Sequence, residues 1–471
     1  MMKFSQLALI SVLCASAALT AAGPGQSLES GGGNNESLNA VLSADGRFVA
    51  FQSAASNLIP GNRNNSWNIF VRDRRMGMTE LISVSSAGVQ GDGDSTQASI
   101  SSEGRYVAFS SFADNLTAGG TNHQWNVFVR DRTAHTTEMI SVSPAGEPGN
   151  HRSESPSPES ISGDGRYVVF QSDSTNLVAG DTVVRWRIYV RDRLEHTTQL
   201  VSVSTAGTRA NKNCRYPSIS ADGRFVTFQC AATNLTPHKD LYNGEYQNIF
   251  LRDLAKGTTE MISISAADMP GDHNSGSATV SADGRFVSFL STAVNLIKGE
   301  EGRAPDLLRA SRGGELPSTR TVPTVRKPDV FVRDRQTGVT RIASVSNSGE
   351  RANHRTFTPF LSAGGGFVAF ESTAGNLVPA GNSTRFRITS EIYLRALERN
   401  ATELVSAFPA RADAPEFSSG SPSLSADGRF VAFHAVVYPQ GTRHFANVYV
   451  RDRQAGTLEL ISVAASPAPS Y

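Results

Sequence analysis

The feature that most constrains the fold of this chain is a motif that recurs seven times. The motif reads Ser-x-Asp-Gly-Arg-aromatic-Val-x-Phe, and its copies, two of them degraded, begin at Ser43, Ser101, Ser162, Ser220, Ser281, Ser362 and Ser425. Successive copies are 58 or 61 residues apart up to Ser281, and the last two spacings are 81 and 63 residues. A repeat of this length indicates a series of similar structural units rather than one irregular domain.

Each unit contains four strand-like segments, which we call A to D. In the first unit these are the segment before Ser43 and residues 47–53, 68–72 and 79–85. The Asp-Gly pair between A and B is typical of a tight hairpin, because glycine adopts the left-handed conformation there without steric cost. The B segments, such as residues 48–51, are apolar at successive positions, which indicates burial on both faces.

Seven such units predict an all-β fold, a seven-bladed β-propeller of four-stranded antiparallel blades. The alternative is a linear solenoid, but the sequence lacks the capping repeats that a solenoid needs. The segment after Asn34 can supply strand A of the first blade, so the ring is expected to close without borrowing a strand. We expect the blades at residues 34–85, 92–143, 150–204, 211–265, 272–346, 353–407 and 416–464.

The propeller is expected to be a single domain over residues 23–471, with a loop insertion in blade 5 at residues 298–327. Residues 1–22 are typical of a secretory signal peptide, because a charged start precedes a short apolar run and small residues. Cleavage after Ala17 or after Ala22 fits equally well. We therefore expect a periplasmic or secreted protein.

Charge and cysteine usage fit this expectation. The chain has 44 Lys and Arg against 43 Asp and Glu, so no nucleic-acid partner is predicted. Beyond the signal no apolar stretch is long enough to span a membrane, and a monomer is expected. Cys214 and Cys230 lie symmetrically about Asp222, in the middle of the blade 4 hairpin turn. Directly opposed strand residues are close enough for a disulfide, which we predict here.

The repeat, together with Asn-Ile-Phe-Val-Arg-Asp-Arg at residues 68–74, resembles the WD40-like propeller repeat of the TolB family. The resemblance covers nearly the whole mature chain. It implies an exported protein-protein interaction scaffold whose partner is an envelope or extracellular protein. Neither the α/β domain that precedes the propeller in TolB nor the hydrolase domain of propeller-bearing peptidases is expected here. Because a fold does not determine a function, binding residues must be sought individually.

The B-to-C and D-to-A connections should share one face of the disc, and the D-to-A loops there carry Asp or Asn at a repeated position. The candidate binding residues from these loops are Asp92, His151, Asp272, His273, Asn353 and His354. They form either a polar ring that holds a cation or a polar ligand, or a set of side chains that cap turns. No metal site is predicted, because no short ligand spacing is present.

The remaining candidates are Trp67, Trp125 and Trp186, which share one repeat position just before strand C in blades 1 to 3. An aromatic arc of this kind can anchor a protein or stack on a glycan, and the alternative is packing between blades. The Arg-Asp-Arg triplets recur in most blades, which indicates a structural role at the C-to-D turn.

No catalytic residue and no cofactor is predicted. The sequence contains no Ser nucleophile elbow, no His-Glu-x-x-His and no paired-Cys metal motif. A binding scaffold is therefore the expected function. The alternative is a carbohydrate-binding propeller, or a carbohydrate-active one of the lyase or hydrolase kind.

Overall fold

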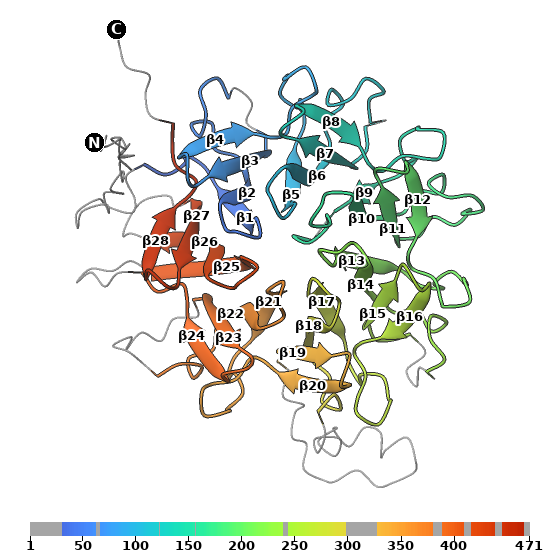
Figure 1. Cartoon of the computed structure of the whole chain (residues 1–471), viewed down its shortest axis with the longest axis vertical. Helices are drawn as coiled ribbons and strands as arrows, with labels where there is room; N and C mark the ends of the chain where they lie inside the picture. Colours follow the sequence, from blue (N-terminus) through green and yellow to red (C-terminus); the bar gives the residue numbers. More distant parts are fainter. Residues whose placement is uncertain are drawn as a thin grey trace, which may run out of the picture.

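The computed structural model describes residues 31–62, 66–121, 123–155, 157–238, 244–297, 327–379, 389–408, 416–438 and 445–465. Within these residues the chain forms seven four-stranded antiparallel sheets, which are arranged as blades around a central axis (Figure 1). The described residues include no helix that could cross a membrane. The expected signal peptide (residues 1–22) and residues 298–326 of the expected insertion lie outside the described residues.

The four strands of every blade pair in chain order, with strand A innermost and strand D outermost. Blades 1 and 2 comprise β1 (Ser37–Leu42), β2 (Phe48–Ser53), β3 (Asn68–Asp73), β4 (Met78–Leu81), β5 (Ser95–Ile100), β6 (Tyr106–Ser111), β7 (Asn126–Asp131) and β8 (Thr136–Met139). Blades 3 and 4 comprise β9 (Ser153–Glu154), β10 (Tyr167–Ser172), β11 (Arg187–Asp192), β12 (Thr197–Leu200), β13 (Cys214–Ile219), β14 (Phe225–Cys230), β15 (Asn248–Asp253) and β16 (Thr258–Met261).

Blades 5 and 6 comprise β17 (Ser275–Val280), β18 (Phe286–Ser291), β19 (Asp329–Asp334), β20 (Val339–Ile342), β21 (Thr356–Leu361), β22 (Phe367–Ser372), β23 (Glu391–Ala396) and β24 (Ala401–Leu404). Blade 7 comprises β25 (Glu416–Leu424), β26 (Phe430–Tyr438), β27 (Ala446–Asp452) and β28 (Thr457–Leu460). The predicted fold class is confirmed.

The ring closes where β1 of blade 1 contacts β25 and β26 of blade 7, and no strand is exchanged. At this closure the N–H of Gly33 donates to the carbonyl of Ser462 at 2.9 Å. Between blades 1 and 2 the N–H of Gly91 donates to the carbonyl of Ser83 at the same distance. The closure therefore copies the D-to-A hairpin that joins consecutive blades, using two separate segments of the chain.

The glycine and the aromatic residue of the repeat meet across blade boundaries. Gly46 has a φ of +72°, and a Cβ atom there would lie 2.3 Å from the Phe430 ring of blade 7. The same kind of contact joins Gly104 to Phe48 and recurs at Gly165, Gly223, Gly284, Gly365 and Gly428. Only glycine fits, because these positions need a left-handed backbone and have no room for a side chain. One motif per blade thus builds the contact with its neighbour.

The Arg-Asp-Arg triplet fastens the C-to-D turn, as predicted, and also joins blades. Asp73 Oδ1 accepts two backbone N–H groups of the turn, at 2.9 and 3.1 Å. Arg47, from the Asp-Gly-Arg motif, donates to the two carboxylate oxygens of Asp73 at 3.1 and 2.6 Å. Arg74 binds Glu459 of blade 7 at 2.8 Å, and its guanidinium lies 4.5 Å from the ring centroid of Phe430.

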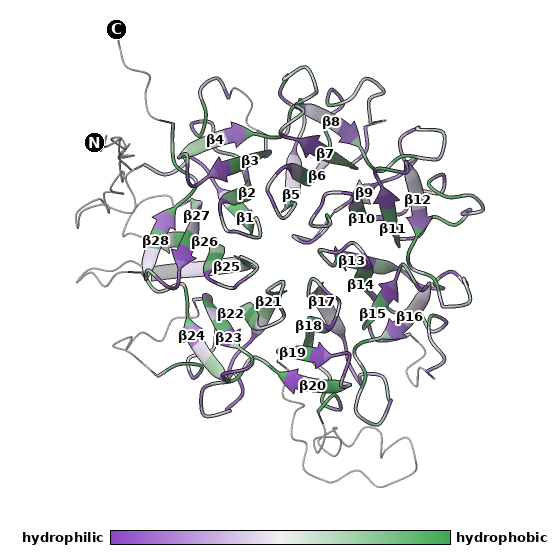
Figure 2. Ribbon diagram, viewed as in Figure 1, coloured by the Kyte–Doolittle hydropathy of each residue, from purple (hydrophilic) through white to green (hydrophobic). Residues whose placement is uncertain are grey.

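The apolar core lies within the blades and between them. Phe51 of β2 and Phe70 of β3 are fully buried, with ring centroids 5.8 Å apart. Another cluster joins Ala50 of blade 1 to Phe109 of blade 2. Burying a phenylalanine stabilises a fold by roughly 1.5–3 kcal/mol, so this packing holds neighbouring blades together. Figure 2 shows apolar stretches within the strands and hydrophilic ends on several of them, such as β8 and β19.

Candidate functional site

The face of the disc that carries the B-to-C and D-to-A connections, here called the loop-rich face, holds the three tryptophans. Trp67, Trp125 and Trp186 directly precede β3, β7 and β11, and each is half-buried. Their carbonyls accept N–H groups from the next blade at 2.7, 2.8 and 2.9 Å, the donors being Ser95, Ser153 and Cys214. These bonds fix the backbone at each tryptophan, while part of each side chain stays exposed.

Arginine side chains lie over two of the indole rings. The Arg215 guanidinium is 4.5 Å from the ring centroid of Trp186, and that of Arg152 is 5.8 Å from the centroid of Trp125. The ring of Phe112, which is 41% exposed, lies 6.1 Å from Trp125. These five residues form an apolar and cationic area over blades 2 to 4, which we call the aromatic-arginine surface.

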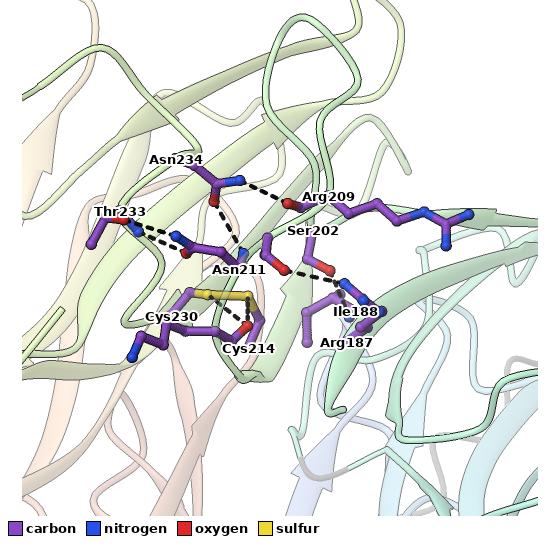
Figure 3. The surroundings of a disulfide bond; sticks show 11 residues. Arg187, Ile188, Ser202, Arg209, Asn211, Cys214, Cys230, Thr233 and Asn234 are labelled. Atoms are coloured by element: carbon purple, nitrogen blue, oxygen red, sulfur yellow. Dashed lines mark hydrogen bonds between the residues drawn. A yellow bond between two sulfur atoms is a disulfide. The ribbon is translucent and has the colours of Figure 1, made fainter. Parts of the chain in front are cut away.

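The Asp and Asn residues of the D-to-A loops bind the B-to-C loop of their own blade. In blade 4 the side chain of Asn211 accepts the backbone N–H of Thr233 at 3.0 Å, and the backbone N–H of Asn211 donates to the side chain of Asn234 at 3.1 Å (Figure 3). Equivalent bonds are made by Asp92, Asn150, Asp272 and Asn353. Bonds of this kind stabilise turns. The side chains that line the central channel come from other positions.

The three histidines of these loops lie in different blades and have different surroundings. His273 stacks on Tyr246 with ring centroids 4.9 Å apart. The N–H of His151 donates to Ser174 Oγ at 3.0 Å, whereas His354 is exposed. Within the described part of the chain, no group of three or more His, Cys, Asp or Glu side chains is arranged to hold a metal ion.

The A segments of the seven blades line a central cavity of about 300 Å³, and in blade 3 the lining residues, Ser157 and Pro158, follow β9. Six of the A strands contain a β-bulge with a non-glycine residue at φ between 37° and 60°, namely Asn39, Gln97, Tyr216, Ser277, Thr358 and Ser421. A left-handed conformation costs such residues roughly 1–2 kcal/mol each. Because the bulge recurs at one repeat position in six blades, it is a structural feature of the A strands.

Small residues narrow the channel on the opposite, turn-bearing face. They are the second residues of the seven motifs, Ala44, Ser102, Gly163, Ala221, Ala282, Ala363 and Ala426. Five backbone hydrogen bonds of 2.8–3.0 Å link neighbours in this ring, including one from Ala426 to Ala44 across the closure. If neighbouring Cα atoms in the ring are ~5 Å apart, as in hydrogen-bonded strands, seven residues enclose a circle about 11 Å across between Cα atoms. The atoms themselves fill most of this width, so the opening is only a few ångström wide. A ligand would therefore enter from the loop-rich face.

Blade 3 departs from the repeat inside the channel. Its strand β9 has only two residues, and nine positions separate Ser153 from the motif serine, where the other blades have six. The additional residues place Glu159 in a narrower bore of about 90 Å³ that adjoins the cavity. Ser218 Oγ of blade 4 donates to Glu159 Oε2 at 2.7 Å, and the backbone of Val280 in blade 5 also hydrogen-bonds this carboxyl group.

Glu159 carries the one carboxyl group among the described residues that line the cavity and the bore. Burial raises the pKa of Glu159 to about 8, against the opposing effect of the bonds from Ser218 and Val280. The side chain is nonetheless partly accessible from the channel. Glu159 is not among the residues predicted from the sequence. The signal that could have found it is the longer spacing in blade 3.

Comparisons with known proteins concern the fold. No protein-family model matches the chain, and no curated protein matches it. Solved structures that resemble it include TolB proteins and other propellers. A prolyl endopeptidase structure matches with 11% sequence identity and a TM-score of 0.53, over 92% of this chain and 50% of that chain. The chain thus spans about half the length of that protein.

Two further solved structures match with lower TM-scores. TolB from Acinetobacter baumannii is 15% identical with a TM-score of 0.38, over 88% of this chain and 80% of that chain. The oligogalacturonate lyase from Vibrio parahaemolyticus is 11% identical with a TM-score of 0.48, over 89% of this chain and 90% of that chain. At these identities the likeness extends to the propeller fold and no further.

Proposed function

We propose that the protein is an exported interaction scaffold of the cell envelope, and that its aromatic-arginine surface binds an acidic segment of a protein partner. The observation that carries the proposal is the position of Arg215 over Trp186, at 4.5 Å. Tryptophan and arginine are the side chains that most often dominate binding at protein interfaces. A guanidinium group held against an indole ring is already ordered, so less entropy is lost when a partner binds.

The loops around Trp186 add positive charge and exposed apolar surface. Residues 182–186 and 205–216 contain three arginines and one lysine, of which Arg209 pairs with the preceding Asp181 at 3.3 Å. Val183 and Val184, just before Trp186, are 49% and 57% exposed. Complementary charge favours an acidic partner, and the valines supply apolar contact area.

A carbohydrate-binding or carbohydrate-active propeller is the second candidate, because exposed aromatic rings can stack on sugars. Arg215 and Arg152 lie over the rings of Trp186 and Trp125, which leaves less of these faces open for a sugar. This placement favours the protein partner.

Two features support export. Residues 1–22 have the pattern of a signal peptide. In addition, Cys214 and Cys230 are joined by a disulfide bond, which suits an oxidising compartment.

The test is capture of a partner from an envelope extract by the immobilised protein and by single variants. Trp186→Ala and Arg215→Glu should each weaken capture about tenfold or more, the effect expected of a dominant interface residue. Arg75→Glu is the matched control, because Arg75 is exposed on the turn-bearing face. The captured protein, once purified, should be displaced by poly-glutamate. Equal capture by all variants would contradict the proposal, and oligosaccharide binding that Trp186→Ala abolishes would favour the carbohydrate alternative.

A further inference from the structure

The side chains that line the channel differ in polarity at three depths, counted from the loop-rich face inward. The first layer is the ring of polar and aromatic residues with positive φ described above, at the mouth. The second layer is apolar and consists of Ala40, Ala98, Pro158, Ala278, Pro359 and Pro422. Below it lies the bore, whose walls are aliphatic or small apart from Phe360, the hydroxyls of Ser99 and Ser102, and Glu159. A ligand that fills the channel thus meets polar groups, then apolar groups, then one carboxyl group.

The carboxyl group of Glu159 is not needed to join the blades. At three other junctions a hydroxyl accepts the corresponding N–H of the next blade. Ser423 Oγ accepts that of Leu42 at 3.1 Å, Thr279 Oγ1 that of Leu361 at 3.0 Å, and Ser99 Oγ that of Ile161 at 3.3 Å. In blades 4 and 5 the equivalent residues are Ser218 and Val280, and both bind Glu159 instead. Burying a carboxyl group costs stability where a serine would suffice, which points to a role in binding.

We infer that the channel binds a primary ammonium ion carried on a short, unbranched apolar chain, with the ammonium group against Glu159 and the chain across the layer of alanines and prolines. No Lys or Arg lines the cavity or the bore among the described residues, so nothing there competes for the carboxylate. The apolar layer suits methylene groups and disfavours a hydrated metal ion. The ammonium ion can belong to a free amine or to a lysine side chain. This site is independent of the aromatic-arginine surface.

Binding should change the protonation of Glu159. With a pKa of about 8, this group is largely protonated near neutral pH in the empty channel. An ammonium ion favours the carboxylate, so Glu159 loses its proton to the solvent while the ammonium group keeps all of its protons. The other ionisable side chain on the channel wall is Tyr216, at the mouth. Binding near neutral pH should therefore release close to one proton per ligand.

The experiment is calorimetric titration of the full chain with n-pentylamine, and with n-pentanol as the uncharged probe of the same length. Pentylamine should bind, pentanol should bind at least about tenfold more weakly, and Glu159→Gln should remove this difference. Titration in two buffers of different ionisation enthalpy should reveal the released proton. Titration with Nα-acetyl-lysine methylamide distinguishes a free amine from a lysine side chain. A channel for free amines should bind pentylamine more tightly than this lysine derivative, and a channel for a lysine side chain should not.

A second variant tests whether the amine binds inside the channel, and it leaves the carboxyl group of Glu159 unchanged. Ser277→Tyr with Ser421→Tyr should narrow the mouth and weaken pentylamine binding, and Tyr216 shows that this bulge position accepts tyrosine. Equal binding of pentylamine and pentanol, unchanged binding by Glu159→Gln, or unchanged binding by the mouth variant would overturn the inference. Thermal unfolding near the wild-type temperature establishes that each variant is folded.

Discussion

Arg47 binds the two carboxylate oxygens of Asp73, and blade 6 lacks both members of this pair, with Gly366 and Ala396 at the corresponding positions. The other five blades keep the ion pair, at 2.6–2.8 Å. An isolated Asp at this largely buried position would lose the arginine that compensates its charge. Because blade 6 lacks both the arginine and the aspartate, it contains no carboxylate without a compensating charge at this position. The two positions therefore act as one unit.

A double-mutant cycle in blade 1 tests this coupling. Arg47→Gly should destabilise the fold, because Asp73 keeps its turn bonds and loses its ion pair. Arg47→Gly with Asp73→Ala copies blade 6 and should cost measurably less than the sum of the single changes. Urea unfolding monitored by circular dichroism gives the three free energies. Simple additivity would mean that the positions are independent.

The repeat made the fold predictable, because the contacts that recur at every blade boundary are made by motif residues that occur in nearly every unit. The Asp-Gly turn and its aromatic residue are visible in the sequence even though Gly46 and Phe430 meet only at the closure. The disulfide of blade 4 was predictable because its two cysteines lie symmetrically about one turn, whereas pairings between unlike positions of neighbouring blades were not. Arg215 lies in a different blade from Trp186, and nothing in the local pattern pairs them. Glu159 lies in an A segment, where the repeat is weakest.

The contact between Gly46 and Phe430 should be sensitive to a single methyl group. Gly46→Ala adds a Cβ atom 2.3 Å from the ring and also forces alanine into a φ of +72°. Gly88→Ala is the matched control, because Gly88 has a φ of +78° and no atom lies within 4 Å of the added Cβ. We expect about 1 kcal/mol of destabilisation for Gly88→Ala from the backbone alone, and about 3 kcal/mol or more for Gly46→Ala. Equal losses in chemical denaturation would show that the ring moves aside freely.

The disulfide occupies a position where four other blades pair two serines. Ser37 and Ser53 share a hydrogen bond of 2.8 Å at the register positions that Cys214 and Cys230 hold in blade 4. Cys214→Ser with Cys230→Ser should therefore fold and restore the repeat. The loss of a cross-link over 16 residues should cost about 3 kcal/mol. Dithiothreitol should lower the unfolding midpoint of the wild type and leave that of the double variant unchanged. If dithiothreitol lowered the unfolding midpoint of the double variant as well, its effect would not arise from reduction of this disulfide.

Glu159 should make the unfolding free energy of the protein depend on pH over a limited range. Comparison of the wild type with Glu159→Gln isolates this contribution. The pKa of this carboxyl is raised to about 8 in the folded state, from an ordinary value of 4.5. Below the lower value both states hold the proton, so the difference in unfolding free energy between wild type and variant should be constant. As pH rises from 4.5 towards 8, the unfolded chain releases the proton while the folded state retains it. The wild type therefore loses stability relative to the variant, by at most about 1.4 kcal/mol per pH unit, and the difference becomes constant again above the upper value.

Unfolding both proteins in urea across this pH range measures the difference in unfolding free energy directly. A difference that does not change with pH would mean that Glu159 is ionised in the folded protein at neutral pH, with its charge stabilised in the bore.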